Sequence, residues 1–269
     1  MLRDITIGQY YSVDSIIHRL DPRIKIIGSI IYIISLFVVG KWQGYLVAAF
    51  FLMIMIKLSK VPFKYMVKGL KSIVMIMMIT VIFNLFLTKG DALVTLGPLK
   101  ITMQGVQVAI NMAVRLVLLV LGSSLMTYTT TPNALTDGLE RVFAPLKVVK
   151  VPVNDMAMMM SIALRFIPIL MDETDKIIKA QQARGADFET GSFMKRAKAM
   201  VPILIPLFVS AFKRANDLAM AMEARCYRGG DGRTRMRPLK YKKRDYVAWV
   251  ILITYLIGMI ILGQILRSI

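Results

Sequence analysis

The residues of this chain best suited to bind a partner are two arginines that each end a long helical pattern. Arg184 lies in the segment QQARGAD and Arg225 in the segment MEARCYRGG, each between an alanine and a small residue. A guanidinium group at the tip of a rigid helix can form forked hydrogen bonds with carboxylates or backbone carbonyls in a groove of another protein. The pattern predicts two docking points, which are formed by Ala183, Arg184 and Gly185 and by Ala224, Arg225 and Cys226.

An ordinary helix end would also explain an arginine followed by a small residue. A cation in the last turn interacts favourably with the negative end of the helix dipole, and a glycine after it can adopt a left-handed conformation. One copy would need no other explanation. Two copies, each ending a helical pattern too apolar to stand alone in water, favour the docking interpretation.

The helices that must position these arginines are long and contain proline. In the first pattern, from residue 154 or 155 to residue 183, apolar residues recur at helical spacing, and Pro168 is expected to bend it. The second pattern starts at Ser192, and Pro202 and Pro206 should bend it. The sequence therefore predicts two long amphipathic helices, each tipped by an arginine.

The composition places the chain in a membrane. Apolar residues make up 57% of its 269 residues, compared with roughly 45–50% in soluble domains. The net charge of +19 could indicate nucleic-acid binding. However, the basic residues lie in loops between apolar runs, where membrane topology and anionic headgroups explain them more simply. We therefore expect the lipid bilayer as a partner, and no nucleic acid.

Five apolar runs predict an all-α polytopic membrane protein with about five transmembrane helices. Only the last two runs reach the roughly 20 residues that cross a bilayer, so the others must borrow flanking residues. Asp21 followed by Pro22 is a good helix start and lets the first span begin early. The runs are 26–40, 45–56, 73–87, 106–126 and 247–266.

The lysines predict the orientation and the domains. Residues 57–72 contain five lysines, whereas residues 41–44 contain only Lys41, so the former loop is expected in the cytoplasm. The N-terminus and the basic segment 127–246 are then cytoplasmic as well. The expected parts are a transmembrane region of four spans (1–126), a cytoplasmic coupling-helix domain (127–246) and a C-terminal transmembrane helix (247–269).

Arg115 lies within the fourth predicted span. A charge there costs several kcal/mol unless it is paired or hydrated, so intramembrane arginines deserve a functional hypothesis. Asn84 and Asn111 are possible neighbours. The sequence leaves open whether Arg115 makes a structural polar contact or serves transport.

Four methionines crowd the start of the first long helix. Methionine is flexible and polarizable, and surfaces that accept several partners use it. Filling of the core or the membrane would explain the same residues, and both interpretations stay open. The cluster consists of Met156, Met158, Met159 and Met160.

The sequence offers little for catalysis. His18 is its only histidine, and it contains no GxxxxGK[ST] phosphate loop. The acidic residues of the first long helix include Asp172 and Asp175, which precede Lys176 and Lys179 by four positions and favour ion pairs over a metal site. Cys226 is the only cysteine, so no intramolecular disulfide is possible. We expect a protein that is not an enzyme and binds no metal or cofactor.

Four motifs resemble, in order, those of the transmembrane T component of energy-coupling factor (ECF) transporters, which are related to ABC importers. The resemblance covers nearly the whole chain. It departs at Cys226, where the family commonly has glycine, and this argues against a left-handed residue there. The motifs are LDPRIK at 20–25, ALRFIP at 163–168, AQQARG at 180–185 and MEARCYRGG at 222–230.

This resemblance implies a non-catalytic scaffold in a bacterial or archaeal cell membrane, serving vitamin or cobalt or nickel uptake. Arg184 and Arg225 would dock into two cytoplasmic ABC-type ATPases, which bind the ATP. An exchangeable substrate-binding membrane subunit, the S component, would be the third partner, and the methionine cluster is a candidate contact for it. A free-standing secondary carrier would instead show inverted repeats, and a polytopic membrane transferase would need an acidic or histidine cluster at the membrane face. Neither feature is evident in the sequence.

Overall fold

The computed structural model describes residues 10–88, 91–96, 99–186, 188, 192–229 and 238–268. The chain divides into two compact units. We call Gly8–Val142 together with Pro238–Ile269 the bundle unit, and Phe143–Arg237 the hairpin unit.

The bundle unit is built from helices and confirms the predicted all-α class. A short antiparallel hairpin, β1 paired with β2, connects α3 to α4 and was not predicted. Its strands contain the β-branched residues Val94, Thr95, Ile101 and Thr102, and Gly97 and Pro98 separate the two strands in the sequence, which is a strand and turn signal. The elements are α1 (Pro22–Val38), α2 (Trp42–Ser59), α3 (Phe63–Leu87), β1 (Ala92–Leu96), β2 (Leu99–Thr102), α4 (Met103–Thr129), α5 (Pro132–Val142) and α8 (Lys243–Ser268).

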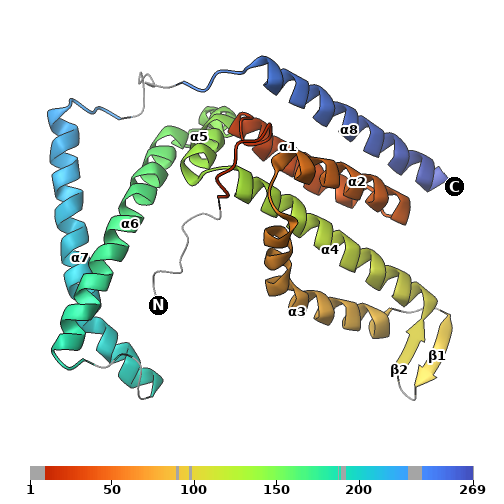
Figure 1. Cartoon of the computed structure of the whole chain (residues 1–269), viewed down its shortest axis with the longest axis horizontal. Helices are drawn as coiled ribbons and strands as arrows, with labels where there is room; N and C mark the ends of the chain where they lie inside the picture. Colours follow the sequence, from red (N-terminus) through yellow and green to blue (C-terminus); the bar gives the residue numbers. More distant parts are fainter. Residues whose placement is uncertain are drawn as a thin grey trace. The chain divides into compact units, whose positions relative to one another are not determined.

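The core of the bundle unit lies where α1, α2, α4 and α8 pack together (Figure 1). Leu36, Ala48, Leu121 and Met259 contribute one buried side chain from each helix. α1 and α4 approach closely at Gly122, since a Cβ there would lie 2.5 Å from a ring carbon of Tyr32. Burial of these apolar side chains is what fixes the helices against one another.

The start of α1 confirms the helix start predicted at Asp21 and Pro22. The Asp21 carboxylate accepts a hydrogen bond from the backbone N–H of Arg23, and Pro22 occupies the first turn. The backbone N–H of Asp21 donates to the carboxylate of Asp245 at 3.0 Å. Asp245 also accepts from the N–H of Lys242 at 2.7 Å, so one buried carboxylate joins the starts of α1 and α8.

The hairpin unit contains the 3-10 helix η2 (Ala144–Val149) and two long helices, α6 (Val153–Ala183) and α7 (Phe193–Ala224). These match the two predicted helices, and α7 follows directly after Ser192. Pro168 lies inside α6 without ending it. In Figure 1 the first part of α7 points in a different direction from the rest, and Pro202 and Pro206 lie inside this helix.

Among the described residues, five helices are long and apolar enough to cross a membrane, or six if the bent helix α3 is counted as one span. The number agrees with the prediction of about five, but not every member does. The five are α2, α4, α6, the part of α7 from Lys198 to Ala224, and α8. The predicted first span corresponds to α1, whose 17 residues are short for a bilayer. The predicted third span lies in α3, which bends by 59° between Phe63–Lys71 and Ile73–Leu87. α6 and this part of α7 were predicted to be cytoplasmic, but they are also long and apolar enough to cross a membrane.

Candidate docking site

Arg184 and Arg225 occupy the same position in two helix ends of the same geometry. Arg184 caps α6 with φ −87° and ψ 6°, and Arg225 caps α7 with φ −94° and ψ 15°. After Arg184, the N–H of Gly185 donates to Gln182 at 2.9 Å and that of Ala186 to Gln181 at 3.0 Å. This pair of backbone hydrogen bonds defines a Schellman motif.

The end of α7 repeats this arrangement with different side chains. The N–H of Cys226 donates to the carbonyl of Glu223 at 2.8 Å, and that of Tyr227 donates to Met222 at 3.0 Å. The residue after the arginine is left-handed in both motifs, with φ 86° at Gly185 and φ 56° at Cys226. The inference against a left-handed residue at Cys226 was therefore wrong. The two cap hydrogen bonds offset the roughly 1–2 kcal/mol that a side chain costs in this conformation.

Both motifs face outward in the described structure. The sequence-predicted docking residues are all exposed, with their arginine side chains at the helix tips. The cap hydrogen bonds use backbone groups alone, so neither guanidinium is needed to close its helix. The exposed residues are Ala183, Arg184, Gly185, Ala224, Arg225 and Cys226.

α6 and α7 are antiparallel, which puts the two arginines at opposite ends of the pair (Figure 1). Arg214 of α7 binds the Glu173 carboxylate of α6 at 2.8 Å, in the second half of both helices. A straight helix of the length of α6, 31 residues, measures about 46 Å. The arginines are thus too far apart to enter one groove together.

A basic depression of about 660 Å³ adjoins the second motif. It lies between the first half of α6 and the end of α7, and Met158, Arg165, Arg225 and Arg228 are among its lining residues. Three arginines around one depression favour an acidic or carbonyl-rich partner surface. The sequence does not indicate that Arg165 and Arg228 share a depression with Arg225, although both lie within the quoted motifs, because the depression depends on how α6 packs on α7.

The methionine cluster lies at the start of α6 and is largely exposed. Met156, Met159 and Met160 are 52%, 62% and 42% exposed, and Met158 is half-buried beside the basic depression. The three exposed side chains do not fill the core of the described unit. They present apolar surface at the start of α6, and Met158 alone of the cluster lines the depression that Arg225 also lines.

Arg115 belongs to the bundle unit and has a clear structural partner. Its Nε and one terminal nitrogen donate to the Tyr45 hydroxyl at 3.1 and 2.7 Å, and its guanidinium lies 5.2 Å from the ring centroid of Phe37. The sequence suggested Asn84 and Asn111 as neighbours; the hydrogen bonds go instead to α2, and the Asn84 amide donates to Thr80. These contacts favour a structural role for Arg115.

No group of three histidine, cysteine, aspartate or glutamate side chains within the described ranges is placed to hold a metal ion. Cys226 is a free, exposed thiol. The candidate site therefore offers guanidinium groups and apolar surface, which suit recognition of another protein.

Comparison with known proteins agrees with the motifs and the helices. The family model CbiQ, described as a cobalt transport protein, matches residues 14–236. The "energy-coupling factor transporter transmembrane protein EcfT" of Ruminiclostridium cellulolyticum is 53% identical over 264 residues, which cover 95% of this chain and 99% of that protein. The proteins of the same name from Clostridium kluyveri and Listeria innocua are 55% and 47% identical. Their alignments cover 92% and 91% of this chain and 93% of each relative.

The matches extend over the bundle unit and the hairpin unit, including both arginine motifs. Identity near half over more than nine-tenths of the chain leaves no large region outside the family. The chain belongs to the CbiQ family and is a transmembrane component of energy-coupling factor transporters.

Proposed function

We propose that this chain couples ATP hydrolysis in two cytoplasmic ABC-type ATPases to uptake through an S component. Arg184 and Arg225 are the two docking side chains. The observation that carries the proposal is the repeated helix end, in which an exposed arginine precedes a left-handed residue. Because backbone groups alone form the cap hydrogen bonds, both guanidinium groups remain available to bind a partner.

The position of the two motifs supports two separate ATPases rather than one. The motifs lie at opposite ends of the antiparallel pair of α6 and α7, so each arginine can enter a groove on a different subunit. Motion of either ATPase would then move one end of the pair. A long, continuous helix is stiff enough to pass such a movement along its length.

The methionine cluster is proposed as part of the contact with the S component. Three exposed methionines can adapt to different partner surfaces, which suits a subunit that is exchanged. The S component would then determine the substrate, either a vitamin or a cobalt or nickel ion. Substrate selectivity would then reside in the S component and not in residues of this chain.

We further propose that α6 and α7 lie on the cytoplasmic side, although both pass the length and composition test for a span. The second half of α6 carries Asp172, Glu173 and Asp175, and α7 carries Lys213 and Arg214 near its middle. Such charges are costly in hydrocarbon. The apolar faces of both helices would be covered by the S component and the membrane surface.

Charge reversal of both arginines tests the docking role. The double variant Arg184→Glu, Arg225→Glu should insert normally in the membrane but lose ATPase subunits on purification or lose ATP-driven uptake. Lysine at both positions should restore function only in part, because it keeps the charge without the planar fork. The measurements are co-purification of the ATPases in mild detergent and uptake by whole cells.

The matched control reverses two other exposed cations, Lys179 on α6 and Lys213 on α7, and changes the net charge equally. It should assemble and transport normally. If the arginines only stabilised the helix ends, the double variant would lose about 1 kcal/mol or less at each end. Substantial uptake by a well-expressed double variant would therefore refute the docking role.

A further inference from the structure

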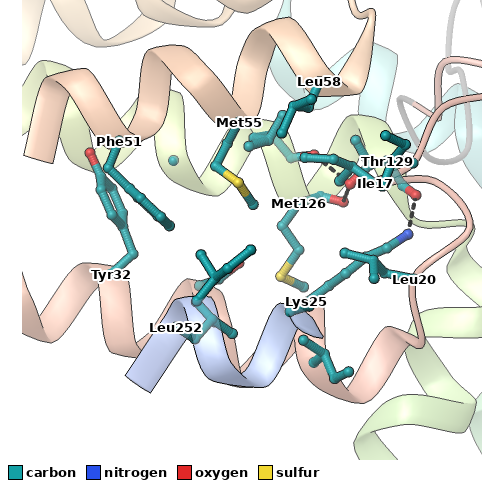
Figure 2. Close-up of a pocket in the computed structure, with 18 of the residues that line it drawn as sticks. Ile17, Leu20, Lys25, Tyr32, Phe51, Met55, Leu58, Met126, Thr129 and Leu252 are labelled. Atoms are coloured by element: carbon teal, nitrogen blue, oxygen red, sulfur yellow. Dashed lines mark hydrogen bonds between the residues drawn. The ribbon is translucent and has the colours of Figure 1, made fainter. Parts of the chain in front are cut away.

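The bundle unit contains an apolar pocket of about 320 Å³, which none of the proposed docking residues lines. It lies between α1, α2, α4, α8 and the segment that precedes α1. Figure 2 shows Leu20, Lys25 and Thr129 at one end of the pocket and Tyr32 and Phe51 at the other. The walls between these ends are mostly aliphatic side chains and methionines.

Lys25 makes one end of this pocket cationic. Its ammonium group donates to the backbone carbonyls of His18 at 3.1 Å and of Thr129 at 2.7 Å. These two hydrogen bonds use two of the three N–H donors of a lysine. Its alkyl stem lies along the pocket and adds to the apolar wall, and its ammonium group lies at one end (Figure 2).

Arg244, in the first turn of α8, adds a second cation at the same end. It lines the pocket, and its buried Nε has no hydrogen-bond partner among the described residues. It is close enough to Lys25 for the two charges to repel each other. A buried N–H donor without an acceptor, next to a second cation, is the arrangement that an anionic ligand would complete.

The carboxylates near this end already accept other hydrogen bonds. Asp21 accepts from the backbone and the guanidinium of Arg23, the latter at 2.9 and 2.8 Å. Asp245 accepts from the backbone N–H groups of Asp21 and Lys242. These two acids partly offset the positive charge at this end, but their oxygen atoms are directed to other donors.

The cationic end coincides with the start of a candidate membrane span. Lys240, Lys242 and Lys243 precede Arg244, and α8 passes the test for a span from Lys243 to Leu266. Basic clusters at the end of a transmembrane helix attract anionic lipid headgroups. An apolar pocket that begins at this end of the helix has walls suited to an acyl chain.

We propose that this pocket seats an anionic phospholipid. One acyl chain occupies the apolar pocket between α1, α2, α4 and α8, and the phosphate accepts hydrogen bonds from Arg244 and Lys25. A phosphodiester supplies both the missing acceptor and the negative charge, and its acyl chain matches the apolar walls. The proposal does not depend on ATPase docking, because the pocket and its cations belong to the bundle unit.

Lipid retention by the purified full-length chain tests the proposal. The protein in mild detergent is offered phosphatidylglycerol or phosphatidylcholine with identical acyl chains, washed, and measured by native mass spectrometry. Phosphatidylglycerol should be retained in preference. Arg244→Gln should weaken its retention about fivefold, the worth of one cation beside anionic headgroups, and Arg244→Lys should recover part of it.

Two further variants make the result specific. Lys64→Gln removes an exposed cation that neither lines the pocket nor belongs to the basic cluster before α8, and it should retain phosphatidylglycerol as the wild type does. Ala248→Trp fills the pocket and should reduce retention of both lipids with Arg244 intact. Equal retention of the two lipids by the wild type, or equal loss in Arg244→Gln and Lys64→Gln, would overturn the proposal. Retention of neither lipid would also overturn it and would leave the pocket to a protein segment.

Discussion

At the scale of single residues, an arginine followed by a small residue at a helix end can indicate either an ordinary helix cap or a docking site. The position of Arg184 and Arg225 at the ends of helical patterns is evident in the sequence, but the backbone conformation of the residue after each arginine is not. Gly185 predicts a left-handed residue by its type, whereas Cys226 adopts the same conformation in a helix end closed by two backbone hydrogen bonds. The sequence contains no marker for that conformation at Cys226.

Exchanging the residue types after the arginines should shift the stability of the two helix ends in opposite directions. Cys226→Gly removes the cost of a left-handed side chain and should stabilise the end of α7 by about 1 kcal/mol. Gly185→Ala should destabilise the end of α6 by a similar amount. The Tyr227 and Ala186 amides each donate a hydrogen bond that closes one helix end. Hydrogen exchange should slow about fivefold at Tyr227 in Cys226→Gly and quicken about fivefold at Ala186 in Gly185→Ala.

The control for this pair is Cys226→Ala, which keeps a Cβ in the left-handed position. It should leave exchange at Tyr227 unchanged. An increase in protection by alanine equal to that by glycine would show that loss of the thiol, and not relief of backbone cost, is responsible.

At the scale of elements, most helices can be predicted from the local sequence, whereas the contacts between helices cannot. Asp21 and Pro22 predict the start of α1 because an N-cap is a local feature. The partner of that start, Asp245, lies 224 residues away in the sequence. Tyr45 was missed as the partner of Arg115 for the same reason, since the contact depends on how α2 packs against α4. The β-hairpin was missed although its strand and turn residues are evident.

The contact between the starts of α1 and α8, which the Asp245 carboxylate makes, should weaken when that carboxylate is lost. Asp245→Ala leaves the backbone N–H groups of Asp21 and Lys242 without their acceptor. Each unpaired donor costs about 1–3 kcal/mol where it is buried. Asp245→Asn keeps one acceptor oxygen and should lose about half as much. Thermal unfolding of the protein in mild detergent measures both changes.

Asp217→Ala provides the comparison, because Asp217 is an exposed acid on α7. Its effect should stay within about 0.5 kcal/mol. If Asp245→Ala unfolded at the same temperature as Asp217→Ala, the contact would contribute nothing to stability.

At the scale of the whole molecule, composition indicates a membrane protein but does not decide which helices cross the membrane. Length and apolar content select α6 and α7 as readily as α2 and α4. The distinction depends on the partner subunits that cover each apolar face, and a single sequence does not describe them. The lysine asymmetry between residues 41–44 and 57–72 is the sequence signal for orientation.

Thiol labelling in intact cells tests that orientation. Gln43 and Lys64 are exposed. Gln43 lies in the first turn of the span α2, and Lys64 lies just beyond the other end of that span, at the start of α3. In a chain without Cys226, cysteine at Gln43 should react with an impermeant reagent from outside. Cysteine at Lys64 should react only after the membrane is opened, because the lysine-rich loop is expected inside.

The native Cys226 is a built-in control, since it is exposed and belongs to the hairpin unit. It should behave like the cysteine at Lys64. Labelling of Cys226 or Lys64→Cys, but not Gln43→Cys, from outside would place the hairpin unit outside the cell and contradict the proposed coupling role.

The matching ends of α6 and α7 bear on stoichiometry. One chain presents the same local shape twice, at opposite ends of an antiparallel pair, so it offers approximate twofold symmetry without being a dimer. Under the proposed docking, two identical ATPases could bind it through one kind of groove, and two diverged ATPases would need to preserve only that groove. A second copy of this chain would compete for the same two ATPases, which favours one scaffold for every two ATPases.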